Sequence, residues 1–216
     1  MTRENLTPPR KPERSVADVV IAHLSIVDFG RRMRGLARGL WAGEIDDFEF
    51  TDSFLSAMER GFEQAWTEGA RTCGIEPGER TDEEATRLNE YIFSQAPYVP
   101  GLADWIAAHN RESDSKLAPI LSRIEIWTNR YNEVMGIAQQ LACADQKMKW
   151  TTDPAKDSCR DCIGYHGRVH RMSVWAKYDI RPQHPSLACG GLKCGCGWAP
   201  TNDPVTPGRP AGMSGG

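Results

Sequence analysis

The sequence predicts a mostly α-helical protein, with an N-terminal domain of four to five helices, a small β-containing module and disordered termini. Apolar residues recur at helical spacing through the first two thirds of the chain. Five of the seven cysteines fall within the 38 residues from 159 to 196, while proline is frequent at both ends and glycine at the C-terminal end. The expected parts are a flexible arm (1–14), a helical domain (15–146), a cysteine-rich module (147–204) and a disordered tail (205–216).

Three helices are expected in the first hundred residues. The first covers residues 15–43, where apolar side chains recur three to four positions apart. The second begins at Thr51 and ends at Gly74, because large apolar residues lie four apart and glycine is a common C-terminal cap. Thr81 and the glutamate three positions later form a capping-box sequence, which predicts a third helix to about residue 95.

A short helix over residues 102–109 and a long helix from about residue 115 complete the helical domain. The long helix carries apolar residues along one side, a pattern more typical of a core face than of a cofactor site. Cys73, in the last turn of the second helix, is expected to serve as a small apolar residue. Nothing in this domain indicates an active site.

After residue 145 the pattern changes from helical to extended. Residues 147–152 alternate in the manner of a short strand, and residues 167–171 are expected to form another, with a Cys-x-x-Cys turn between them. Trp150, Trp175 and Trp198 are spread through this stretch and are expected to form a small core.

The cysteine spacing favours a structural zinc site that staples the module together. Cys159 and Cys162 form a Cys-x-x-Cys turn that directs two thiolates to one point, and a second group supplies the other ligands. A segment this short and polar needs such help, and structural zinc contributes on the order of 10 kcal/mol to folding. Disulfides, redox-active thiols and cysteines without a cross-link remain the alternatives.

The remaining ligand positions have several candidates. Cys189, Cys194 and Cys196 compete for them, with a flexible glycine between the last two, and His184 is a further candidate. His166 and His170 are expected to be exposed.

Charge is distributed unevenly along the chain. Residues 147–216 hold ten lysines and arginines against five aspartates, a net charge of +5, which leaves −8 for residues 1–146 in a chain of net charge −3. A basic module suits contact with nucleic acid or an acidic partner, although a solvated surface is an equal explanation. Without an apolar signal core or a run of about 18 apolar residues, we expect neither secretion nor a membrane segment, and hence a reducing compartment.

Several catalytic classes are excluded or disfavoured by missing motifs. A zinc deaminase needs a His-x-Glu sequence, whereas the module contains no glutamate. The Asp-His and downstream Cys-x-x-Cys pattern of a His-Asn-His nuclease is missing. The chain also has no P-loop, dinucleotide fingerprint, His-Glu-x-x-His or Gly-x-Ser-x-Gly sequence. We therefore expect a protein that is not an enzyme.

The order of motifs in the module resembles that of phage minor head proteins, the head-morphogenesis proteins similar to the F protein of phage Mu. The motifs are Lys149-Trp150, Cys159-x-x-Cys162, Gly167-Arg168-Val169, Ser173-x-Trp175, Pro182-Gln183-His184-Pro185 and the final cysteine cluster. The segments Gly39-Leu40-Trp41, Ala65-Trp66 and Trp127-x-Asn129-Arg130-Tyr131 are similar to those of short phage proteins of this type. In that family His-Pro is commonly followed almost directly by Cys-Arg-Cys, whereas here a loop containing Cys189 intervenes.

The resemblance implies a minor capsid protein of the virion head that acts in head assembly or genome delivery. Its expected partners are the phage portal or major capsid protein, with packaged DNA as a further contact of the basic module, and no membrane. It would be found in the virion head, and in the host cytoplasm during assembly. The alternative is a zinc-dependent nucleic-acid-binding regulator or nuclease that carries a helical domain.

Overall fold

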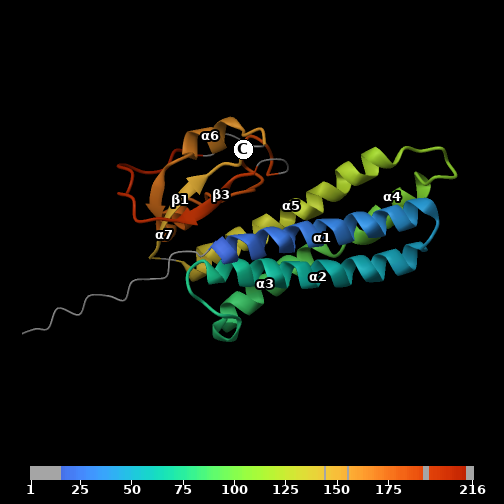
Figure 1. The fold of residues 1–216 in the computed structure, drawn as a ribbon, viewed down its shortest axis with the longest axis horizontal. Helices are drawn as coiled ribbons and strands as arrows, with labels where there is room; N and C mark the ends of the chain where they lie inside the picture. The colour runs from blue at the N-terminus through green and yellow to red at the C-terminus, as the bar shows by residue number, and fades with distance from the viewer. Residues whose placement is uncertain (1–15, 144, 155, 192–194, 213–216) are drawn as a thin grey trace, which may run out of the picture.

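The computed structural model describes residues 16–143, 145–154, 156–191 and 195–212, with side chains from residue 25 onward. A helical bundle carries a small module above one end (Figure 1). The helices of the bundle are α1 (Val16–Ala42), α2 (Asp47–Arg71), the 3-10 helix η1 (Pro77–Glu79), α3 (Asp82–Gln95), α4 (Tyr98–Ala108) and α5 (Leu117–Ala142). The module contains β1 (Lys147–Thr151), α6 (Arg160–Tyr165), β2 (Val169–Arg171), α7 (Met172–Lys177) and β3 (Gly197–Pro200). The predicted mostly helical N-terminal domain and β-containing module are therefore confirmed, while the predicted arm 1–14 lies outside the described residues.

Capping residues set where the helices begin. The predicted start of α2 at Thr51 is one turn late, because the Asp46 side chain accepts a 2.7 Å hydrogen bond from the Glu49 N–H and caps the helix there. The capping box of Thr81 is present at the start of α3, as the sequence predicted. The predicted start of α4 at residue 102 is also late, because Pro100 lies in the first turn of the helix, where proline is tolerated.

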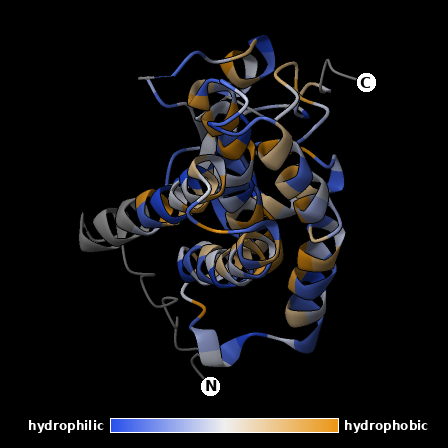
Figure 2. Ribbon diagram, turned by 90° about the vertical axis from the view of Figure 1, so that its right-hand side faces the viewer, coloured by the Kyte–Doolittle hydropathy of each residue, from blue (hydrophilic) through white to orange (hydrophobic). Residues whose placement is uncertain are grey.

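The core of the bundle forms where α1 and α5 pack against α2. Close approach is possible because glycines face the neighbouring helices: a side chain at Gly61 would collide with the Phe29 ring of α1, and one at Gly69 with the Met135 backbone of α5. Apolar and polar segments alternate along the helices (Figure 2), and the buried apolar residues of α1 to α5 form one cluster. Among the described residues, no helix combines the length and apolar character that crossing a bilayer requires.

The module is built on a three-stranded antiparallel sheet with the order β2-β1-β3. β1 and the antiparallel β2 lie within the predicted segments, but β3 was not predicted. The three tryptophans form the module's core as expected, with ring centroids 5.7 Å apart for Trp150 and Trp175 and 6.0 Å apart for Trp150 and Trp198.

Cys73 forms a disulfide with Cys143, so the expectation that it is only a small apolar residue is wrong. Cys73 follows α2 and Cys143 is the C-cap of α5. The two helices end side by side, which brings the Cα atoms to 5.4 Å, within the usual range for a disulfide. Both residues also pack with the buried residues of the module, at its junction with the bundle.

The predicted disordered tail is wrong for residues 205–212. The backbone N–H of Thr206 donates to the Val169 carbonyl at 2.8 Å, and its hydroxyl accepts from the Val169 N–H at 2.9 Å. Further along, the Ala211 carbonyl accepts from the Tyr165 hydroxyl at 2.7 Å. The segment thus covers the outer edge of β2, whose backbone groups need partners. Residues 213–216 lie outside the described part.

A buried ionic network joins the bundle to the module. Glu133 of α5 is buried and accepts hydrogen bonds from the Tyr91 hydroxyl of α3, at 2.8 Å, and from Arg130. Arg181 of the module lies 3.8 Å from the same carboxyl and 2.6 Å from Asp179. Burial and the Glu133 charge raise the pKa of Tyr91 well above its usual value, so this group stays a neutral donor. Charges buried in this way are tolerated only when paired, which favours one docking geometry for the module.

Candidate metal centre

Three thiols converge between α6 and the loop that precedes β3. The sulfur atoms of Cys159, Cys162 and Cys189 all lie within 4.8 Å of one another, and those of Cys159 and Cys162 are 3.4 Å apart. Tetrahedral zinc with Zn–S bonds of about 2.3 Å places its sulfur ligands roughly 3.8 Å apart. The cluster therefore matches the dimensions of a thiolate metal site.

The Cys-x-x-Cys segment forms this arrangement through its own backbone. Cys159 immediately precedes α6, and Cys162 lies in the first turn of that helix. Partial burial raises the pKa of the Cys159 thiol, but hydrogen bonds from the backbone N–H groups of Cys162 and Asp161, and hydrogen bonding with the Cys162 and Cys189 thiols, outweigh this effect and lower the pKa. The net result is a pKa below the usual value, which favours the thiolate form that binds metals.

Cys189 is brought to the pair by a loop with a demanding backbone. Gly190 and Gly191 both have positive φ, at 63° and 73°, a region that glycine adopts without strain. A side chain on Gly191 would also collide with the backbone of Gln183. The loop is tied to α6 by Asp161, whose buried carboxylate accepts a 2.8 Å hydrogen bond from the N–H of Ala188, the residue before Cys189.

Asp161 is expected to act as a positioning residue for the third thiol. Asp161→Ala removes the acceptor that holds the Cys189 loop and should weaken zinc binding by about 10–100-fold, the usual range for outer-shell partners of a metal site. Asp161→Asn keeps an acceptor oxygen and should restore most of the affinity. Asp157→Ala, at an exposed aspartate of the same segment, is the control. Competition with a chromophoric chelator measures the affinities, and equal values for Asp161→Ala and wild type would contradict this role.

His184 does not lie in the three-thiol cluster. Its Nε2 atom lies 3.1 Å from the Asp179 carboxylate, and its Nδ1 atom accepts a 3.0 Å hydrogen bond from the Ser186 N–H. Burial and the neighbouring Arg181 lower the pKa of this imidazole. Both ring nitrogens are thus used to hold the turn before the Cys189 loop, and neither is left for a metal.

Two candidate ligands remain, Cys196 and Cys194, and the structure describes only the first of them. Cys196 is buried in the same apolar cluster as the tryptophans and Cys162, but it is not one of the three thiols that lie within 4.8 Å of one another. Its carbonyl accepts a 3.3 Å hydrogen bond from the side chain of Gln183. Cys194 lies outside the described residues.

The remaining histidines of the module, His166 and His170, contact other side chains of the module. His166 is exposed, as predicted, and its Nδ1 atom lies 3.0 Å from the Thr152 hydroxyl. The prediction that His170 is exposed is wrong: its ring packs edge-on against Trp175, with centroids 4.8 Å apart, and burial lowers its pKa.

The described residues thus provide three thiolates that can hold a soft divalent metal such as zinc. Sequence reasoning missed Asp161, although a carboxylate inside a Cys-x-x-Cys turn is a visible signal of a partner for a neighbouring loop. Comparison of the chain with protein-family models, curated proteins and solved structures finds no match.

Proposed function

We propose that this chain is a phage minor head protein, a virion component without enzymatic activity that acts in head morphogenesis. Its helical domain docks on the portal or major capsid protein, and its zinc module contacts packaged DNA or another head protein. The observation that supports this best is the module itself. The Cys-x-x-Cys pair meets a downstream cysteine, after a helical domain, in the motif order that resembles this family.

The proposed metal is a structural zinc ion with four protein ligands. Cys159, Cys162 and Cys189 supply three thiolates of suitable spacing. Among the candidates for the fourth position, His184 has both ring nitrogens engaged. This leaves Cys194 and Cys196 as the proposed candidates for the fourth ligand.

The surroundings of the histidines support a structural role for the metal. Hydrolytic zinc sites keep one position open for water and hold the ion through imidazoles or carboxylates, or through cysteines beside a general-base glutamate, and the module contains no glutamate. In the module, His184, His166 and His170 each have a hydrogen-bonding or packing partner away from the thiols. A closed thiolate site of this kind stabilises a fold and presents its surface.

The charge of the module supports contact with a polyanion. Its net charge of +5 contrasts with −8 for the preceding residues. Lys156, Arg160, Arg171 and Lys177 are exposed on its surface. Binding to DNA through such side chains should be independent of sequence and should weaken steeply as salt is raised.

The decisive experiment is assembly of heads from the portal and major capsid proteins of the phage genome that encodes this chain. Purified heads should contain the chain by mass spectrometry, and a Cys159→Ser/Cys162→Ser variant should be incorporated less. Purified protein should bind duplex DNA without cutting it in the presence of Mg²⁺ or Zn²⁺. Cleavage that is lost on Cys162→Ala would favour the nuclease alternative, and heads that never contain the chain would refute the proposal.

A further inference from the structure

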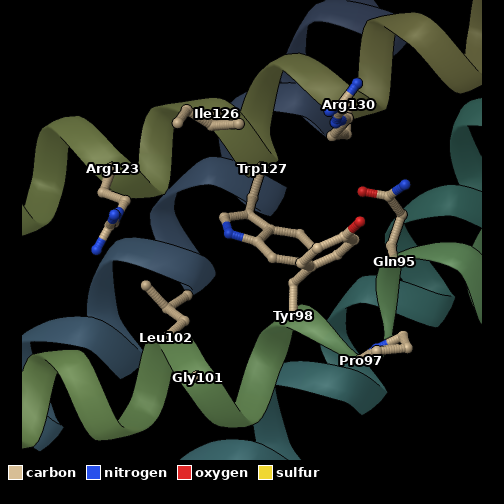
Figure 3. A pocket seen from close by; sticks show the side chains of 9 residues that line it. All are labelled: Gln95, Pro97, Tyr98, Gly101, Leu102, Arg123, Ile126, Trp127 and Arg130. Atoms are coloured by element: carbon tan, nitrogen blue, oxygen red, sulfur yellow. The ribbon is translucent and has the colours of Figure 1, made fainter.

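A groove of about 520 Å³ lies between α4 and α5, outside the metal module (Figure 3). Its floor is apolar, because Trp127 and Leu102 line it and are 7% and 6% exposed. Tyr98 stands at its edge with 66% of its surface exposed. The groove therefore offers an aromatic and aliphatic surface for an inserted apolar side chain.

Arg123 gives the groove a positive edge. The second arginine of the lining, Arg130, lies seven residues further along α5, about 10 Å along the helix, and is already paired with the buried Glu133. The Arg123 guanidinium lies over the Trp105 ring at 4.3 Å, a contact through its face that leaves the N–H edges for a carboxylate. None of the described residues that line the groove is acidic. The matching ligand is an apolar group flanked by a carboxylate.

The same chain presents such a group at the start of α2. Phe48 is 80% exposed, more than any other large apolar residue in the described part of the chain. Residues 44–52 hold five acidic side chains and no basic one. Glu44 and Asp47 precede the phenyl ring, and Asp52, one turn later, shares its face of the helix. We call this acidic, aromatic projection the Phe48 knob.

We propose that the Phe48 knob of one copy docks in the α4–α5 groove of a second copy. The side chains are chemically complementary: the phenyl ring meets Trp127 and Tyr98, while a flanking carboxylate meets the exposed Arg123. Because each copy carries both a knob and a groove, two copies that dock reciprocally close as a two-fold dimer, whereas a single knob–groove contact is heterologous and leaves one unused knob and one unused groove at the ends. Repetition then builds a ring or a chain of subunits. This contact is independent of the metal site and of the function proposed above.

Sedimentation velocity over a concentration series tests the contact. The wild-type protein should show a mass that rises with concentration, and the rise should be smaller at high salt because the contact includes an exposed ion pair. Phe48→Ser, which alters an exposed side chain, should remain monomeric. So should Tyr98→Ser/Arg123→Glu, whose two exposed positions lie on the groove.

Mixing the two variants tests whether the knob and the groove are the two sides of one contact. Each is monomeric alone, but the Phe48→Ser copy keeps an intact groove and the Tyr98→Ser/Arg123→Glu copy keeps an intact knob. The mixture should therefore form a dimer that stops at two copies. Phe93→Ser is the matched control, because Phe93 is 73% exposed but lies outside the acidic stretch and the groove lining.

Three results would overturn the proposal. A wild-type protein that stays monomeric at every concentration would show that the groove does not bind a second copy of the chain. Association that persists in Phe48→Ser would show that the knob is not the contact. Equal loss of association in Phe93→Ser would place the interface on another face. Circular dichroism of each variant confirms that its helices are intact.

Discussion

Replacing Cys159 or Cys189 by serine is expected to remove the metal and unfold the module while the helical bundle stays folded. A structural zinc ion contributes on the order of 10 kcal/mol of apparent folding free energy, which is comparable to the whole stability of a small domain. The bundle has a separate apolar core formed by its own helices. Its amides should therefore remain protected when those of the module exchange.

Elemental analysis of protein purified under reducing conditions, combined with hydrogen exchange resolved by segment, measures this effect. About one zinc per chain is expected for wild type, and none for Cys159→Ser or Cys189→Ser. His184→Asn is the control and should retain the metal, because both ring nitrogens of His184 are already hydrogen-bonded. Full zinc content in Cys189→Ser, or its loss in His184→Asn, would contradict the ligand set.

Removing the Cys73–Cys143 disulfide is expected to lower the free energy of unfolding by about 4 kcal/mol. The two cysteines are 70 residues apart in sequence, and closing a loop of that length restricts the unfolded chain by roughly this amount. The bond lies at the junction of bundle and module. Its loss should therefore destabilise both parts together.

Urea unfolding of the Cys73→Ala/Cys143→Ala variant measures the difference. Dithiothreitol should shift wild type toward the variant and leave the variant unchanged, and zinc content should stay the same in both. Non-reducing mass spectrometry identifies the bond directly. Two reduced thiols in wild type purified without reductant, with equal stability of the two proteins, would refute this prediction.

Much of the bundle is predictable because its signals are local. Helical periodicity marks the long helices, and the capping box at Thr81 places the start of α3. Errors occurred where a terminus depends on a single side chain, as with Asp46 at α2. β3 was missed because a four-residue strand acquires its identity only by pairing with β1.

The metal site was likewise predictable from the sequence only in part. Cys159 and Cys162 could be assigned from sequence because three residues of turn fix their separation. Choosing Cys189 among the later cysteines required the path of the loop, which depends on Asp161 and on the left-handed backbone of Gly191. His184 was a reasonable candidate by residue type, but its neighbours in space use both of its ring nitrogens.

By itself, the sequence determined the helical class of the first domain, the tryptophan core of the module and the first pair of thiolates. These properties depend on residue periodicity and on spacings of a few residues. Only the tertiary structure decided the third thiol, the Cys73–Cys143 disulfide and the anchoring of residues 205–212. Each of these joins segments tens of residues apart, and the distance between such segments is set by the packing of the whole chain.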